Sequence, residues 1–143
     1  MRAAPGDPPV DQTDEQREVV KEFWPNGKPR LHREVLRSPA GALVDDGTYT
    51  RWYENGLKEY QATYARGRLH GVETAWHQNG QKRTEQHYDH GSRHGARYDW
   101  DEQGRLRREE HYLKDRPHGT WTIWKSDGSI KWQARFDHGK PLP

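Results

Sequence analysis

Nine histidines among 143 residues raise the question of metal binding. His87, His90 and His94 would occupy a strand end and the following turn, where three imidazoles could converge on one ion. Their spacing matches no strong zinc signature. His70 and His118 form a second set with His94, at an interval of 24 residues, in which each imidazole can hydrogen-bond local backbone. We therefore predict structural or surface roles for the histidines, and neither a metal nor a cofactor.

Two groups of carboxylates have the residue types for acid–base catalysis. Glu109 and Glu110 are adjacent in sequence, and neighbouring residues on a strand point to opposite faces, so they cannot act as a pair. Asp99 and Asp101 share a face about 6.8 Å apart. General acid catalysis also needs a pocket that raises one pKa, and a single-layer sheet has few pockets. The chain also has no cysteine, phosphate-binding loop or nucleophile elbow, so we predict no enzymatic activity.

The composition limits the classes of fold and partner. Only 29% of residues are hydrophobic and 32% are charged, too few apolar residues for the thick core of a doubly wound α/β fold. Seven Trp and seven Tyr indicate packing by aromatic rings. Lys and Arg number 24 against 22 Asp and Glu, which argues against nucleic acid as the partner.

The sequence shows no membrane or export segment. No stretch approaches the roughly 20 apolar residues that span a bilayer. The first residues, MRAAPGDPPVDQ, lack the apolar region of a signal peptide. We expect a cytoplasmic protein, or a periplasmic one if an export signal has been removed.

A period of 24 residues organises the chain. It is defined by three columns: Trp52, Trp76, Trp100 and Trp124; Gly56, Gly80, Gly104 and Gly128; and Tyr64, Tyr88, Tyr112 and Phe136. Residues 47–143 hold four units, at 47–70, 71–94, 95–118 and 119–142. Residues 17–46 form a degenerate first unit with its extra residues at 38–41, and residues 1–16 are expected to be a flexible, proline-rich arm.

Each unit carries the signals of a β-hairpin. A three-residue loop such as Glu54-Asn55-Gly56, with glycine in the left-handed conformation, places Trp52 opposite Lys58. From this register we predict that the Trp column and the Tyr column lie on the same face and form the structural core. The predicted fold is all-β: an antiparallel meander of about ten strands in a twisted, curled single-layer sheet, with a short helix or an extended cap at the N-terminus.

The unit that contains W-Y-E-N-G-L-K at residues 52–58 resembles the bacterial variant of the MORN repeat, tandem arrays of which make up the YwqK-type antitoxin family. The resemblance covers residues 47–142 closely and 18–46 loosely. It implies a sheet of β-hairpins and a non-enzymatic binding role. The chain departs from the pattern at Asp115, which replaces a glycine, and at Glu73 and Arg97, which replace an aromatic that Tyr49 and Trp121 retain.

The resemblance implies an antitoxin or immunity protein, a monomer alone or a heterodimer with a cognate protein toxin. We expect the polar face and the exposed ends to bind the toxin, through Arg83, Glu85, Arg97, Asp99, Asp101, Arg107, Glu109 and Trp121. The alternative is a membrane-associated scaffold that recognises acidic lipid head groups. The near-neutral net charge of +2 argues against it. An enzyme would require a metal near His87, His90 and His94.

Overall fold

The computed structural model describes residues 14–143, which form one antiparallel sheet of thirteen strands. The strands are β1 (Gln16–Phe23), β2 (Pro29–Arg37), β3 (Leu43–Trp52), β4 (Lys58–Ala65), β5 (Arg68–Leu69), β6 (Gly71–Trp76), β7 (Lys82–Asp89), β8 (Ser92–Trp100), β9 (Leu106–Leu113), β10 (Arg116–Pro117), β11 (Gly119–Trp124), β12 (Ile130–Asp137) and β13 (Lys140–Pro141).

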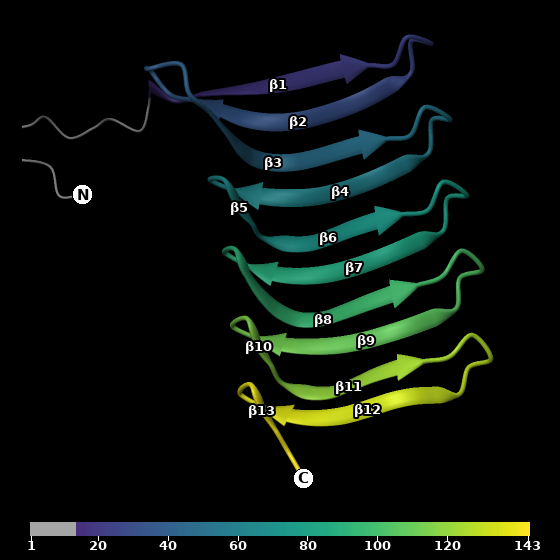
Figure 1. The fold of residues 1–143 in the computed structure, drawn as a ribbon. Coiled ribbons are helices and arrows are strands. Elements are labelled where there is room, and N and C mark those ends of the chain that lie inside the picture. The colour runs from purple at the N-terminus through teal and green to yellow at the C-terminus, as the bar shows by residue number, and fades with distance from the viewer. Residues whose placement is uncertain (1–13) are drawn as a thin grey trace, which may run out of the picture.

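The hairpins stack one after another in an open sheet whose first and last strands lie at opposite ends (Figure 1). The main order is β1-β2-β3-β4-β6-β7-β8-β9-β11-β12-β13, while β5 pairs with β4 and β10 pairs with β9. The predicted meander is confirmed, and ten long strands form it. The short strands β5 and β10 accompany turns between hairpins, and β13 follows the last hairpin. Residues 14–143 contain no helix, and so none that is long and apolar enough to cross a membrane.

The forward turns, which join the two long strands of a hairpin, are three-residue loops. In the β3–β4 hairpin, the N–H of Tyr53 donates to the carbonyl of Leu57 over 2.8 Å, and the N–H of Gly56 donates to that of Tyr53 over 2.9 Å. Gly56 has φ 88°, in the left-handed region where glycine costs least. The predicted loop at Glu54-Asn55-Gly56 is confirmed.

A β-bulge next to each forward turn separates the two aromatic columns. Trp52 pairs with Lys58 as predicted, but the next pair is Arg51 with Tyr60, so β4 has one extra residue. The same shift occurs in the three later hairpins. A shift of one residue turns all subsequent side chains to the other face. The prediction that the Trp column and the Tyr column, represented by Trp52 and Tyr64, share a face is therefore wrong.

The sheet consequently has two faces of different composition. We call one the tyrosine face: it carries positions 49, 51, 60, 62 and 64 and their equivalents 24, 48 and 72 residues later. We call the other the tryptophan face: it carries positions 48, 50, 52, 58, 61 and 63 and their equivalents. Each face has one layer of side chains. Within residues 14–143 the buried residues are Val35, Leu36, Thr50, Ala62, Thr74, Ala75, Gln86, Glu110, Tyr112 and Thr122.

Side chains at the forward turns tie each hairpin to the next. Trp24, Tyr53 and His77 occupy equivalent positions, and each is hydrogen-bonded at 2.6–3.1 Å to the backbone carbonyl of a Trp in the following unit. In the next hairpin this position is Asp101, whose ionised carboxylate cannot donate. Arg107 from the adjacent bulge donates to the Trp124 carbonyl instead, over 3.0 Å.

The return turns, which lead from one hairpin to the next, are also tied to their neighbours. Gly67, Gly91 and Gly139 each donate their N–H over 2.7 Å to a carbonyl that lies 22 residues earlier, at Asp45, Leu69 and Pro117 respectively. Asp115 takes the glycine position in one unit, with φ 66°. Its carboxylate accepts the backbone N–H of Arg93 at 2.9 Å and the Nε of Arg93 at 3.1 Å, and these bonds hold the pKa of Asp115 below its usual value. These contacts offset the strain of a non-glycine residue there.

The degenerate first unit is a full hairpin of β1 and β2. The loop after β2 closes with the N–H of Ser38 donating to the carbonyl of Ala42 over 2.9 Å, and it contains residues 38–41, where the extra residues of this unit were expected. Residues 1–13 of the predicted arm at 1–16 lie outside the described part of the chain. Beyond them, Glu15 pairs with Arg66 at 3.1 Å and β1 already begins at residue 16.

Candidate partner-binding face

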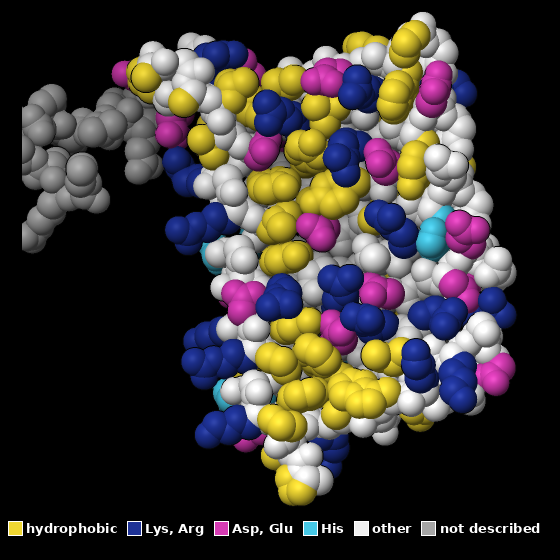
Figure 2. Space-filling view, viewed as in Figure 1, with side chains coloured by type: hydrophobic (Ala, Val, Ile, Leu, Met, Phe, Trp, Pro, Cys, Tyr) yellow, Lys and Arg dark blue, Asp and Glu magenta, His cyan; other side chains and the backbone are white. Residues whose placement is uncertain are grey.

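The tyrosine face presents hydrophobic side chains in two groups with charged side chains between them. Figure 2 shows this face: yellow side chains gather over the upper and the lower hairpins and are interrupted by dark blue and magenta ones. The sequence accounts for the pattern, because the column that begins with Tyr49 continues as Glu73 and Arg97 and returns to an aromatic at Trp121. Glu73 and Arg97 thus lie on one surface, on either side of Gln86.

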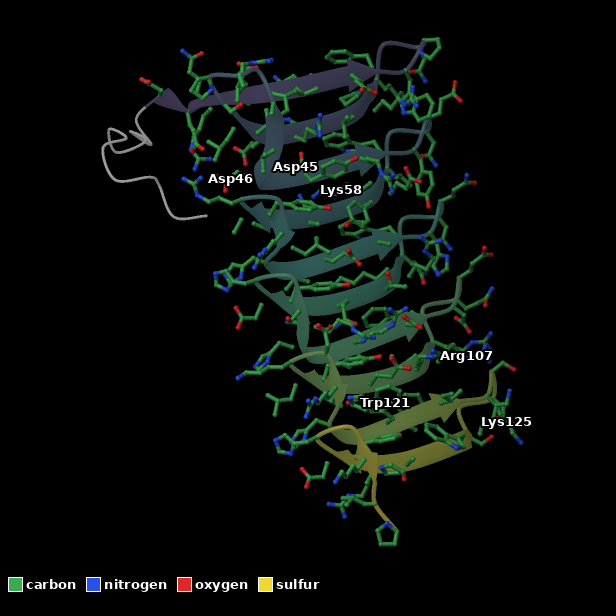
Figure 3. The ribbon with its side chains drawn as sticks, turned by 60° about the vertical axis from the view of Figure 1, so that its left-hand side comes forward. Asp45, Asp46, Lys58, Arg107, Trp121 and Lys125 are labelled. Atoms are coloured by element: carbon green, nitrogen blue, oxygen red, sulfur yellow. The ribbon has the colours of Figure 1, made fainter. Side chains whose placement is uncertain are left out.

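Two aromatic clusters flank the charged region. In the first, Tyr49 packs against Tyr60 and Tyr64, with ring centroids 5.9 Å away in both cases. In the second, Trp121 lies between Tyr112 at 5.1 Å and Phe136 at 5.0 Å. The Trp121 indole N–H also donates to the carbonyl of His111 over 2.8 Å, which fixes the ring on the sheet (Figure 3).

Between these clusters lies what we call the charged band: Glu73, Arg97, Asp99, Arg108 and Glu110. Arg108 bridges two carboxylates, with Nε 3.6 Å from Asp99 Oδ2 and Nη1 3.2 Å from Glu110 Oε1. The two ends of the band are bonded to the aromatic clusters, since Tyr60 donates to Glu73 at 2.8 Å and Tyr112 donates to Glu110 at 2.7 Å. Charges and rings form one continuous surface.

The tyrosine face also holds polar atoms without partners. Within residues 14–143, the buried side-chain atoms that lack a hydrogen bond are Arg33 Nε, Gln86 Oε1, Arg97 Nε and Asp99 Oδ1. Gln86 is 2% exposed and lies directly opposite Arg97. Arg97 Nη2 comes within 3.2 Å of Asp99 Oδ1 as an ion pair, but without hydrogen-bond geometry. A buried unpaired polar atom costs about 1–3 kcal/mol. Neighbouring side chains cover these atoms, so the charged region between the aromatic clusters is held at a cost in stability.

The hydroxyls of Tyr60 and Tyr112 on this face stay protonated at neutral pH. Burial, followed by the hydrogen bond to Glu110, raises the pKa of Tyr112 to about 12. Burial and the bond to Glu73 likewise raise the pKa of Tyr60. Both hydroxyls therefore act as donors to the charged band.

We expect the free energy of unfolding to fall between pH 10 and pH 12. A phenol with a raised pKa keeps its proton in the folded protein at a pH where the unfolded chain, near 10, loses it, so the folded state binds more protons and stability drops as pH rises. Urea midpoints at pH 9, 10, 11 and 12 should decline less steeply for Tyr112→Phe than for the parent. Tyr98→Phe, on the tryptophan face, is the control. Equal slopes for the parent and Tyr112→Phe would contradict the assignment.

The residues expected to bind a partner are divided between the two faces. Arg97, Asp99 and Trp121 lie on the tyrosine face. Glu85 and Glu109 lie on the tryptophan face, each beside a histidine, at 3.3 Å and 2.7 Å respectively. The eight residues therefore do not all lie on one face of the sheet.

The remaining expected residues lie near the forward turns. Arg83 and Arg107 are the extra residues of their bulges. Asp101 accepts from Arg105 Nε at 2.9 Å and lies 3.7 Å from Arg107 Nη1. In Figure 3, Arg107 and Lys125 are at this edge of the sheet, away from Trp121.

Sequence reasoning did not include Gln86, Arg108 and Glu110 among the partner-binding residues. Gln86 and Glu110 belong to the column that begins with Ala62 and ends with Ala134. The polar residues at positions where the outer units have alanine are visible in the sequence and could have indicated a functional role. This signal was not recognised because, without the bulge, the alternation of side chains between the two faces does not place this column beside Arg97.

The rings expected to form a core pack in single layers. Of the four Trp, three Tyr and one Phe, Tyr112 is buried and the others are half-buried. On the tryptophan face, Lys58 Nζ lies 5.7 Å from the centre of Trp76 and Lys82 Nζ lies 5.9 Å from that of Trp100. These cation–π contacts join consecutive hairpins, each worth about 0.5–1 kcal/mol at exposed sites.

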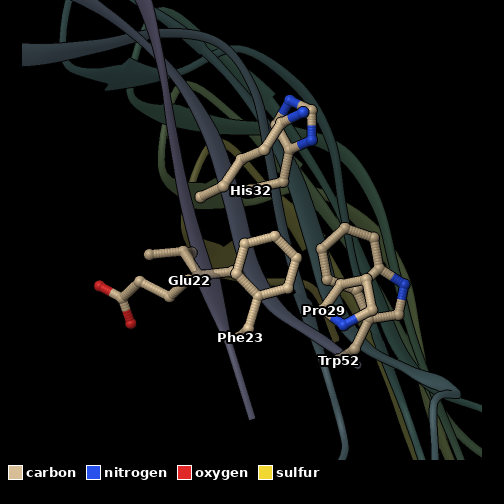
Figure 4. A pocket seen from close by; sticks show the side chains of 7 residues that line it. Glu22, Phe23, Pro29, His32 and Trp52 are labelled. Carbon is tan, nitrogen blue, oxygen red and sulfur yellow. The ribbon is translucent and has the colours of Figure 1, made fainter. Parts of the chain in front are cut away.

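A shallow cavity of about 270 Å³ lies on the tryptophan face at the β1 end. Figure 4 shows Phe23, Pro29 and Trp52 around it, with the carboxylate of Glu22 directed away from the rings. Ligand pockets usually measure about 300–1,000 Å³ and converge polar groups on the ligand. This cavity fits one apolar side chain better than a substrate.

Comparison with known families agrees with this geometry. Residues 45–65 and 69–90 match a family model described as MORN repeat variant. These two hairpins are MORN repeats. The matched segments cover the β3–β4 and β6–β7 hairpins, and the β8–β9 and β11–β12 hairpins repeat their pairing and their bulge, so the same structural unit continues to Asp137. No curated protein matches the chain.

Proposed function

We propose that this MORN-repeat protein is an antitoxin or immunity protein, which neutralises a protein toxin by binding it and catalyses no reaction. The observation that carries the proposal is the tyrosine face, where charged side chains lie between two aromatic clusters. The kind of partner is supplied by the resemblance of the repeat to the YwqK-type bacterial antitoxin family.

The residue types of the tyrosine face support a protein partner. Tyr, Trp and Arg are enriched at protein interfaces and dominate their binding energy. The charged band has three carboxylates and two guanidinium groups, so a complementary partner presents both signs with a basic excess. Such complementarity speeds association and makes it salt-sensitive.

The dimensions of the face are also suitable. Ten long strands at about 4.8 Å spacing extend for about 43 Å, and six to ten residues at about 3.3 Å give a width of about 20–33 Å. The area is at least the roughly 800 Å² that each partner contributes to a standard interface. One face can therefore hold a whole interface while the other stays in solvent.

Acidic lipid head groups are a weaker candidate. A polybasic cluster contributes about 1 kcal/mol per Lys or Arg near an anionic surface. The charged band instead alternates Arg97 and Arg108 with carboxylates, and the net charge of the chain is only +2. The test below therefore also measures binding of the chain to vesicles of acidic lipid.

The test is co-expression with the product of the neighbouring open reading frame. We expect relief of that protein's toxicity and a co-purifying complex. The variant Arg97→Gln/Asp99→Asn removes both charges, keeps the shape at position 99 and leaves a shorter polar side chain at position 97. It should raise the Kd roughly 10- to 100-fold, since each 1.4 kcal/mol is tenfold.

The matched control is Lys82→Gln/Glu85→Gln, which removes an ion pair of 2.8 Å from the opposite face and is also charge-neutral overall. We expect its Kd to stay within about threefold of the parent. The proposal is wrong if no complex forms and no toxicity is relieved, or if flotation with vesicles of acidic lipid captures the chain without a protein partner. Equal weakening by both variants would reject the tyrosine face as the interface.

A further inference from the structure

Two equivalent groups of metal-ligating side chains occur at the return turns. In the first, His70 follows β5, while Asp89 and His90 lie at the end of β7 and in the turn after it. In the second, 48 residues later, the same positions are held by His118, Asp137 and His138. Within each trio, one ligand atom from each residue lies within 4.8 Å of the other two.

The contacts in the two trios are the same. In the first, the backbone N–H of His90 donates to His70 Nδ1 at 3.1 Å, and His90 Nδ1 lies 2.7 Å from Asp89 Oδ1. In the second, the corresponding distances are 3.3 Å and 2.5 Å. The imidazole centroids are 4.2 Å apart in the first trio and 4.8 Å apart in the second. The repeat therefore builds one geometry twice.

We propose that each trio binds one divalent transition-metal ion, such as Zn²⁺, through two imidazoles and one carboxylate, with water as the fourth ligand. Tetrahedral zinc ligands at about 2.0–2.2 Å from the ion lie about 3.3 Å from one another. His70 Nδ1 is already 3.6 Å from Asp89 Oδ1, and His118 Nδ1 is 3.7 Å from Asp137 Oδ1.

The hydrogen bonds indicate how an ion would enter. Because His70 Nδ1 accepts a backbone N–H, it carries the lone pair that a metal takes. Between His90 Nδ1 and Asp89 the ion would displace the shared proton, as metal ligands must be deprotonated. The side chains of this trio are 44–67% exposed, so a hydrated ion can reach them and the freed backbone N–H can turn to water.

The unit between the two trios serves as an internal reference. It has His94 in the histidine column, but Leu113 and Lys114 take the places of the Asp and the second His. Lys114 has φ 48°, close to the 44° of His90 and the 47° of His138. The turn thus adopts the same backbone with residues that cannot bind a metal, so copying them into the trios should preserve the fold.

The test is calorimetric titration of the tag-free full-length chain with Zn²⁺ alone at pH 7.5, together with the visible absorption of Co²⁺. We expect two ions per chain. The variant Asp89→Leu/His90→Lys should bind one, and adding Asp137→Leu/His138→Lys should leave none. Zn²⁺ should raise the unfolding midpoint of the parent but not that of the fourfold variant.

The control is His87→Gln/His111→Gln, which removes the other two histidine–carboxylate pairs, on the tryptophan face. It should still bind two ions with unchanged affinity. Far-UV circular dichroism of all variants verifies that the sheet is retained. The proposal is overturned if the parent does not bind up to millimolar Zn²⁺, if the turn replacements leave the stoichiometry at two, or if the control lowers it.

Discussion

Trp121→Ala is expected to destabilise the protein by about 2–3 kcal/mol, below the range of about 3–5 for a fully buried Trp because this ring is half-buried. Truncation removes the ring between Tyr112 and Phe136 and the hydrogen bond from the indole to the carbonyl of His111. A urea titration followed by far-UV circular dichroism measures the loss.

The location of the loss is a second readout. A repeat contacts only its neighbours, so the effect should concentrate in the last hairpin, and amide exchange should accelerate across β11 and β12 while β3 and β4 are unchanged. Trp132→Ala is the control, since Trp132 is 44% exposed on the same hairpin. We expect a cost for it below about 1 kcal/mol. An equal cost for both variants would show that the ring cluster at Trp121 is not a packing centre.

Gly47→Ala is expected to cost about 2–4 kcal/mol, from two separate causes. Gly47 has φ 116°, a conformation that disfavours any side chain. An added Cβ would also lie 2.2 Å from Glu34 Oε2 and 3.0 Å from Glu34 Cβ, so the carboxylate that accepts the Thr48 N–H would have to move. The unfolding midpoint in urea reports the sum of the two costs.

Gly71→Ala separates the two causes. Gly71 occupies the same position in the next unit and also has positive φ, but an added Cβ would meet nothing within 4 Å. We expect about 1 kcal/mol for this variant, from backbone strain alone. Stability losses of the same size for Gly47→Ala and Gly71→Ala would show that the Glu34 side chain moves away without a cost in free energy. The close contact would then not contribute to the effect.

Much of the fold could be predicted because repetition makes local signals consistent. The interval between Trp52 and Trp76, and glycine at Gly56, specify hairpins of fixed length with a three-residue loop, and the structure has both. The face of the sheet on which the Trp rings and the Tyr rings lie could not be predicted. The extra residue at Glu59 changes the alternation by one, and an extended chain shows no sign of where a bulge will be.

The candidate sites were less accessible to sequence reasoning because their members come from different hairpins. Arg97 and Asp99 were expected at an interface, but their neighbour Gln86 was not, since the pairing of β7 with β8 brings it opposite Arg97. The histidine column was recognised at His70, whereas its contact with His90 depends on a return turn 20 residues further on.

The sequence alone determined the period, the turn chemistry and the all-β class, because these depend on residues close together in the chain. The tertiary structure decided which side chains share a face and which turns meet. Those outcomes depend on register between strands, and one bulged residue in each hairpin reverses the face of every side chain beyond it.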